Sequence, residues 1–94
     1  MDTKDLLAFI AVYEHCSISN AAKKLFITAQ GVSKIVRKLE NELEVKLFDR
    51  NAHGVTPTTY GEGLYQNSQI IIGYLERIKL DTKSSGKEKK KKLE

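Results

Sequence analysis

Several residue types that mark other classes of protein are scarce or missing in this chain. Its 94 residues include one cysteine, one proline and no tryptophan, and only 7% are aromatic. A lone Cys16 cannot form an internal disulfide, so nothing indicates an oxidising compartment and we expect the protein in the cytoplasm. The longest apolar run, Leu6 to Tyr13, has 8 residues, whereas a membrane-spanning helix needs about 20. Asp2 and Asp5 precede that run, unlike the basic start of a signal peptide.

The chain also lacks the residue sets that catalysis or metal binding would need. Its length allows one small domain, which excludes separate catalytic and binding domains within it. No nucleophile, base and orienting residue can be assembled from adjacent elements, and His15, Cys16 and His53 do not have the spacing of metal ligands. We therefore expect neither an enzyme nor a cofactor or metal, and interpret Cys16 as a small packed residue rather than a redox switch.

The basic charge is unevenly distributed. The net charge is +4, and residues 83–94, with 6 Lys and 2 Glu, account for all of it. Residues 1–82 balance 10 basic against 10 acidic side chains, so the total charge says little about a nucleic-acid partner. The local pattern is more informative, because no acid occurs from His15 to Leu39. That stretch holds five cations: Lys23, Lys24, Lys34, Arg37 and Lys38.

Apolar spacing predicts two helices in the first part of the chain. Three- and four-residue steps predict a first helix over about residues 3–14. Ser19 is expected to cap a second, short helix over residues 20–25, in which Ala21 and Ala22 are small enough for close helix contact.

A third helix is predicted to begin after the capping residue Thr28 and to run to about Glu44. Its buried face follows the helical period through Val32, Val36, Leu39 and Leu43. Its other face carries Gln30, Ser33, Lys34, Arg37 and Lys38. Acidic residues return only at its end, at Glu40, Glu42 and Glu44.

Two short strands are predicted next, over residues 47–50 and 55–57, joined by the Gly-containing turn Asn51-Ala52-His53-Gly54. Such a small ribbon is not stable alone, so we expect it to lean on the helices as a wing. The expected fold is mostly α: a winged helix-turn-helix with a three-helix core and a β-hairpin wing over residues 1–57, followed by a long linker helix.

The linker helix is predicted over residues 58–81. Its apolar positions have a 4-3-4-3 spacing close to a coiled-coil seam, at Leu64, Ser68, Ile71, Leu75 and Ile78. A long apolar helix that projects from a small domain needs a partner, so we expect a homodimer through these residues. Residues 82–94 are Lys-rich without an apolar period and are expected to be a disordered tail. Leu93-Glu94 looks like a cloning remnant, and whether the tail is native stays open.

A short helix, a tight turn and a longer helix with one basic face form the arrangement that fits an α-helix into the DNA major groove. We expect Gln30 and Ser33 near base edges, and the cations beyond them at phosphates. The start of the helix adds free backbone N–H groups and the positive end of the helix dipole. The candidate DNA-binding residues are Thr28, Ala29, Gln30, Ser33, Lys34, Arg37, Lys38, Arg50, Asn51 and His53.

The segments AFIAVYEHCSISNAAKKLFITAQGVSKIVRKLENELEVKLFDR and GVTPTTYGEGL together resemble the N-terminal domain of LysR-type transcription regulators. In that family a run like SxxxAAxxLxxxxxxxSxxIxxLExxLxxxLFxR precedes a wing and a TxxG helix start. The resemblance covers about residues 3–80. The residues assigned to matching places are Ser19, Ala22, Leu25, Ser33, Leu39, Glu40, Leu43, Leu47, Phe48, Arg50, Thr58 and Gly61.

The resemblance implies a bacterial homodimer on partly palindromic double-stranded DNA. It also implies a C-terminal effector-binding domain, which this sequence does not contain, so we expect the chain to be a fragment that senses no ligand itself. Many members have Gln then Pro where this chain has Ala29 then Gln30, so the usual glutamine contact is lost or displaced by one residue. His53 and Thr56 stand where wings often carry Arg or Lys.

Several alternatives stay open at this level. Lys23 and Lys24 are either phosphate contacts or ordinary solvated side chains, and Arg50 either reaches DNA or braces the wing through Asp49. The balanced charge of residues 1–82 also fits a dimerisation or protein-docking module that never touches nucleic acid.

Overall fold

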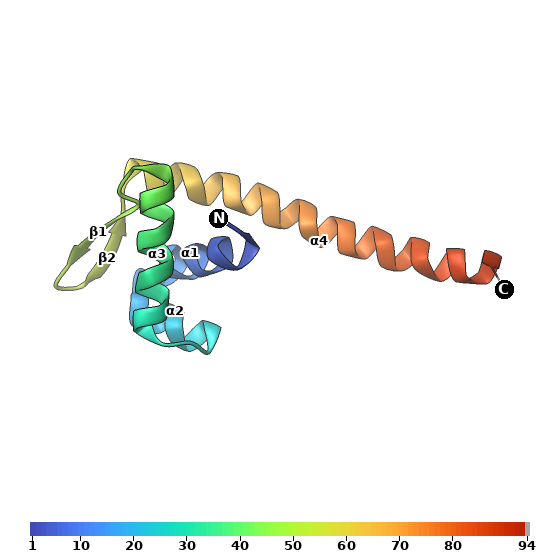
Figure 1. Cartoon of the computed structure of the whole chain (residues 1–94), viewed down its shortest axis with the longest axis horizontal. Coiled ribbons are helices and arrows are strands. Elements are labelled where there is room, and N and C mark those ends of the chain that lie inside the picture. The colour runs from blue at the N-terminus through green and yellow to red at the C-terminus, as the bar shows by residue number, and fades with distance from the viewer. Residues whose placement is uncertain (94) are drawn as a thin grey trace.

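The computed structural model describes the backbone of residues 1–93 and the side chains of residues 1–83. Three short helices and a two-stranded hairpin form a small head, and one long helix projects from it (Figure 1). The elements are α1 Thr3–His15, α2 Ile18–Leu25, α3 Ala29–Leu43, β1 Phe48–Asn51, β2 Gly54–Pro57 and α4 Thr59–Leu93. The predicted winged helix-turn-helix with a linker helix is therefore confirmed.

The core lies where α1, α2 and α3 meet the base of the hairpin. Phe9 and Val12 of α1, Val32 and Leu39 of α3, and Leu47 before β1 are all 0% exposed. Phe48 and Val55 add the inward side of the hairpin, so the wing leans on the helices as expected. This core holds α3 by one face and leaves its other face to solvent.

Side-chain caps begin the helices. Thr28 caps α3 as predicted, because its Oγ1 accepts the Gly31 N–H at 3.0 Å. The predicted Ser19 cap of α2 is wrong, since Ser17 Oγ accepts the Asn20 N–H at 3.1 Å and the helix starts at Ile18. Ile18 packs against the core, and this burial places the start of the helix earlier than the polar pattern alone indicated.

The hairpin is anchored at the end of α1. Cys16 ends that helix in the left-handed conformation, and its carbonyl accepts the Val55 N–H at 3.2 Å. Gly54 has φ 129°, and a Cβ there would overlap the Cys16 carbonyl oxygen, so only glycine permits this close approach. Because the Cys16 side chain is exposed, the prediction that it is a small packed residue is wrong.

The start of α4 is fixed to the segment that leads into β1. Thr58 donates its N–H to the Leu47 carbonyl at 3.0 Å and its hydroxyl to the Lys46 carbonyl at 2.6 Å. The same hydroxyl accepts the Gly61 N–H at 3.1 Å, so Thr58 caps the helix that the sequence pattern placed there. A Cβ on Gly61 would overlap the Leu47 carbonyl.

The helix α4 continues to Leu93, past residue 81, where the loss of apolar spacing had predicted its end and a disordered tail. Each residue added to a formed helix gains a backbone hydrogen bond, so apolar spacing is not needed for continuation. The side chains of residues 84–94, including the suspected cloning remnant, lie outside those described.

Candidate nucleic-acid interface

One face of α3 points away from the core along its whole length. Gln30, Ser33, Lys34 and Arg37 follow the helical spacing on this outward face, and Ser33 is half-buried while the other three are exposed. Among the described side chains, no carboxylate lies within ion-pair distance of Lys34 or Arg37. The outward face therefore presents an amide, a hydroxyl and two uncompensated cations to solvent.

Asn41 extends the outward face by one more turn and is exposed. It was not among the predicted site residues, although its place four residues after Arg37 was readable from the helical period. Its amide can both donate and accept hydrogen bonds, which adds a further polar group to the surface.

The N-terminal end of α3 is also open. Thr28 uses its hydroxyl as the cap, and the N–H groups of Ala29 and Gln30 have no acceptor among the described residues. Both residues are exposed. Free amides at a helix N-terminus, together with the helix dipole, favour an anion.

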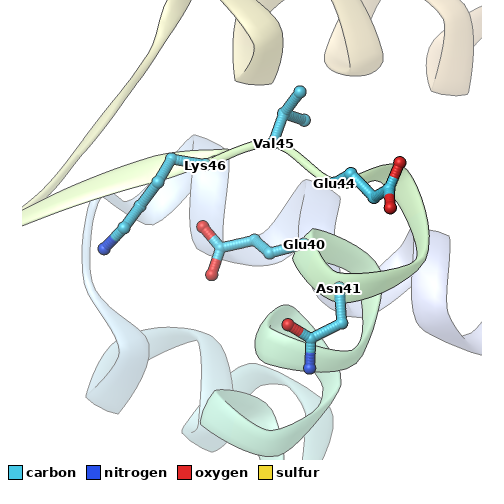
Figure 2. Close-up of a pocket in the computed structure, with 5 residues that line it drawn as sticks. All are labelled: Glu40, Asn41, Glu44, Val45 and Lys46. Atoms are coloured by element: carbon cyan, nitrogen blue, oxygen red, sulfur yellow. The ribbon is translucent and has the colours of Figure 1, made fainter.

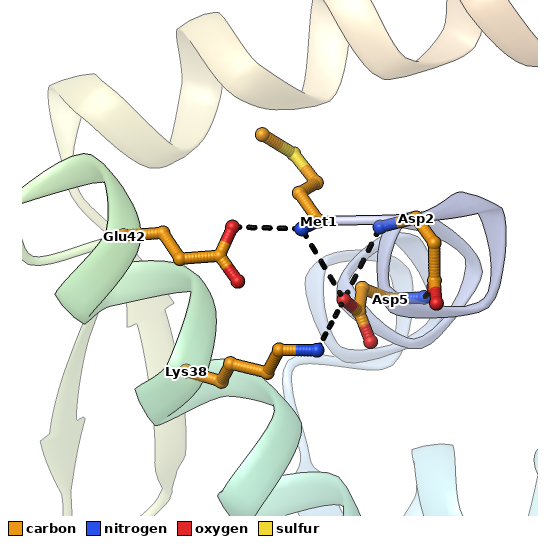
Figure 3. Close-up of polar contacts among 5 residues, drawn as sticks. All are labelled: Met1, Asp2, Asp5, Lys38 and Glu42. Carbon is orange, nitrogen blue, oxygen red and sulfur yellow. Dashed lines mark hydrogen bonds and ion pairs between the residues drawn. The ribbon is translucent and has the colours of Figure 1, made fainter.

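Lys38, in contrast, has an intramolecular partner. Its Nζ lies 3.3 Å from Asp5 Oδ2, and the N-terminal ammonium of Met1 lies 2.8 Å from Glu42 Oε2 (Figure 3). The hydrogen bond and the charge of Asp5 raise the pKa of Lys38. Lys38 thus braces α3 against α1, and its predicted role at a phosphate stays a prediction.

Polar contacts within the wing order its turn. Asn51 Oδ1 accepts the His53 N–H at 2.9 Å, and Asn51 Nδ2 donates to Thr56 Oγ1 at 3.2 Å. Arg50, Asn51 and His53 are all exposed. No ion pair joins Arg50 to Asp49 in the described part of the chain, so the guanidinium is free to contact a ligand.

Glu40 ties the wing to α3. Its Oε2 accepts the N–H groups of Leu47 at 2.8 Å and Phe48 at 3.4 Å. It lines a shallow depression of about 410 Å³ with Asn41, Glu44, Val45 and Lys46 (Figure 2). These two backbone hydrogen bonds assign Glu40 to positioning the wing. In residues 1–83 no three His, Cys, Asp or Glu side chains are arranged to hold a metal ion.

The predicted dimerisation residues of α4 are divided between two environments. Ser68 is 0% exposed within the single chain, and its hydroxyl has no hydrogen-bond partner among the described residues. Leu64 and Leu75 are half-buried. Ile71 and Ile78 are 46% and 57% exposed, and their neighbours Ile70 and Tyr74 are 57% and 63% exposed.

This division defines a free apolar stripe on α4 that consists of Ile70, Ile71, Tyr74 and Ile78. Ser68 belongs instead to the buried side, with Leu64 and Tyr65, which pack against the core of the head. The spacing of apolar residues along α4 could not separate these two sides, because a contact within the chain and a contact with a partner leave the same pattern.

The geometry defines a class of protein: a winged helix-turn-helix domain with a polar, basic outward face on its third helix and a long helix after the wing. The model of the lysR family of bacterial regulatory helix-turn-helix proteins matches residues 3–62, and the chain belongs to that family. Within the described residues, no helix is sufficiently long and apolar to span a membrane.

Relatives named as transcriptional regulators are similar over most of the chain. An HTH-type regulator from the ibpB-leuC intergenic region of Azotobacter vinelandii is 42% identical over 76 residues, which cover 81% of this chain and 53% of that protein. The regulator YbdO of Escherichia coli K12 is 36% identical over 76 residues, which cover 81% of this chain and 25% of that one. The chain thus spans about half or less of these relatives.

Solved structures with the same fold include two DNA complexes. The DNA-binding domain of CbnR bound to DNA is 26% identical, with a TM-score of 0.86, covering 92% of this chain and 99% of that one. The DNA-binding domain of BenM on catB site 1 is 30% identical, with a TM-score of 0.88, covering 92% and 97%.

Proposed function

We propose that this chain binds double-stranded DNA in a sequence-specific manner, with α3 in the major groove, as the DNA-binding part of a LysR-type regulator in the bacterial cytoplasm. The observation that carries the proposal is the outward face of α3, on which Lys34 and Arg37 lack carboxylate partners in the described structure. The similarity to DNA complexes of related domains supports it. No catalytic role is assigned to any residue.

Each exposed group on α3 has a role that fits its chemistry. Gln30 is suited to base edges because an amide donates and accepts together, and Ser33 lies one turn further along the same face. Lys34, Arg37 and the free amides of Ala29 and Gln30 contact phosphates, which fix the register of the helix. In the wing, Arg50 and His53 contact the backbone or an adjacent minor groove.

Two copies of the chain are proposed to pair through the free apolar stripe of α4. The exposure of this apolar surface to water is unfavourable, and a second α4 would cover it. The surface consists of Ile70, Ile71, Tyr74 and Ile78. Pairing would present two recognition helices to a partly palindromic site. Effector sensing, which the family resemblance implies, is assigned to no residue of this chain.

The test is selection of bound duplexes from a random pool, followed by measurement of affinity for the selected duplex at rising salt. We expect one enriched motif, and a salt slope that falls by about 1 for each phosphate contact removed by Lys34→Ala or Arg37→Ala. Lys79→Ala, an exposed lysine on α4, is the matched control. Binding without an enriched motif would indicate only polyanion attraction, and no binding would favour a docking module.

A further inference from the structure

A cluster of polar and aromatic side chains joins α1 to α4. The rings of Tyr13 and Tyr65 stack with centroids 3.8 Å apart and planes 7° from parallel. The Tyr65 hydroxyl donates to Glu14 Oε2 at 2.8 Å and accepts from Gln69 Nε2 at 2.6 Å. The hydrogen bond to Glu14 raises the pKa of Tyr65. We call Tyr13, Glu14, Tyr65 and Gln69 the tyrosine clamp.

The tyrosine clamp continues into the core of the head. Tyr13 lies 6.3 Å from Phe9 between ring centroids, and Phe9 lies 5.3 Å from Phe48 at the start of β1. Four aromatic rings therefore run from the hairpin through α1 to α4. The direction of α4 is thus fixed by directional contacts to α1 as well as by the apolar packing of Leu64 and the buried Ser68.

The direction of α4 matters because this helix is long. Ile78, at the far end of the free apolar stripe, follows Tyr65 by 13 residues, which is about 20 Å of helix. A tilt of about 10° at Tyr65 would displace that end by about 3 Å over such a length. This displacement is close to the rise of one base pair, about 3.4 Å.

We propose that the tyrosine clamp sets the angle between the recognition head and α4, and thereby the spacing between half-sites that a dimer accepts. The inference rests on the proposed function, since it needs DNA binding by a dimer paired through α4. Tyr13, Glu14, Tyr65 and Gln69 act as positioning residues, because none belongs to the outward face of α3. Their loss should change which spacings are bound rather than which bases are read.

The test uses duplexes that carry two copies of the selected half-site, with their separation varied one base pair at a time. Wild type should bind one separation best. In Tyr65→Leu, which removes both the stack and the hydroxyl, we expect the preference for the best separation over its neighbours to fall about threefold or more. Tyr60→Leu, an aromatic residue 62% exposed in the first turn of α4, is the control and should keep the wild-type profile.

Binding to a duplex with a single half-site distinguishes the proposed DNA binding from the proposed effect of the tyrosine clamp on spacing. Tyr65→Leu should bind it as wild type does, which also shows that the variant is folded. Tyr65→Phe keeps the ring stack and should give an intermediate spacing profile, so it decides the matter if Tyr65→Leu does not fold. If the folded variants keep the wild-type spacing profile, the proposed role of the tyrosine clamp is wrong, while the proposed DNA binding stands. Failure of wild type to bind any duplex would overturn the proposed function and this inference with it.

Discussion

The ammonium of Lys38 lies 3.3 Å from the carboxylate of Asp5, a residue that is only 5% exposed. This ion pair joins α3 to the first turn of α1, where the Asp5 side chain also accepts the Asp2 N–H at 3.2 Å. Lys38, which the sequence pattern placed at DNA, thus has a partner within the head. Lys34 and Arg37 remain as the cations of α3 without a carboxylate partner among the described residues.

This difference between neighbouring lysines predicts opposite effects on substitution. Lys38→Ala removes the nearer of the two cations that face the buried Asp5 carboxylate and leaves only the Met1 ammonium, 4.0 Å away. We therefore expect a lower melting temperature with little change in the salt slope of DNA binding. Lys34→Ala should reduce the salt slope of DNA binding and leave the melting temperature nearly unchanged. Thermal denaturation and salt-dependent binding of both variants check this. If Lys38→Ala instead reduces the salt slope and leaves the melting temperature unchanged, Lys38 contacts a phosphate.

Base reading is predicted to depend on Gln30. Gln30→Ala should relax the preference at one base position of the selected site, by about 1–3 kcal/mol if the amide makes a good bidentate contact. Lys34→Ala should instead weaken all sequences alike. Comparison of selected motifs from the two variants checks the assignment. An unchanged motif in Gln30→Ala would show that another residue reads the bases.

The cap of α2 predicts a contrast between two nearby serines. Ser17→Ala removes the acceptor of the Asn20 N–H and should lower the free energy of unfolding by about 1 kcal/mol. Ser19→Ala, at an exposed position just inside the helix, should change it by less than about 0.5 kcal/mol. Urea denaturation of both variants measures the difference. Equal losses would contradict the start of α2 at Ile18.

Pairing through the free apolar stripe predicts that charged substitutions within the stripe disrupt the dimer, whereas one outside the stripe does not. Glu in place of both Ile71 and Ile78 would put like charges into the seam, so we expect monomers in sedimentation experiments. Leu80 is 67% exposed on α4 outside this stripe, and Leu80→Glu should leave the dimer intact. Dimers that persist in the double variant would place the interface elsewhere.

The capping carboxylate of Asp2 predicts a pH dependence. Its pKa is lowered from 3.8, mainly by the Asp5 N–H that it accepts. The ionised form is therefore favoured in the folded state, and the stabilisation is present above pH 3.8 and lost as the pH falls through the folded pKa. In Asp2→Ala, the free energy of unfolding should fall less steeply with decreasing pH than it does in the wild type. Asp49→Asn, at an exposed wing position, should not.

The helical period was sufficient to predict the two faces of α3 and its Thr28 cap, because both depend on residues a few positions apart. The Lys38–Asp5 pair was not predictable in this way, since its partners are 33 residues apart and meet only when α1 packs on α3. The buried position of Ser68 was missed for a related reason. Its place in the apolar spacing of α4 is the same whether the head or a second chain covers it.

Photo-crosslinking tests most directly whether the outward face of α3 enters the major groove. A photoreactive side chain placed at Lys34 of the full chain should crosslink to bases or backbone within the selected site. The same group at Lys79 on α4 should give no crosslink there. Crosslinks from position 79 without crosslinks from position 34 would contradict this placement of α3.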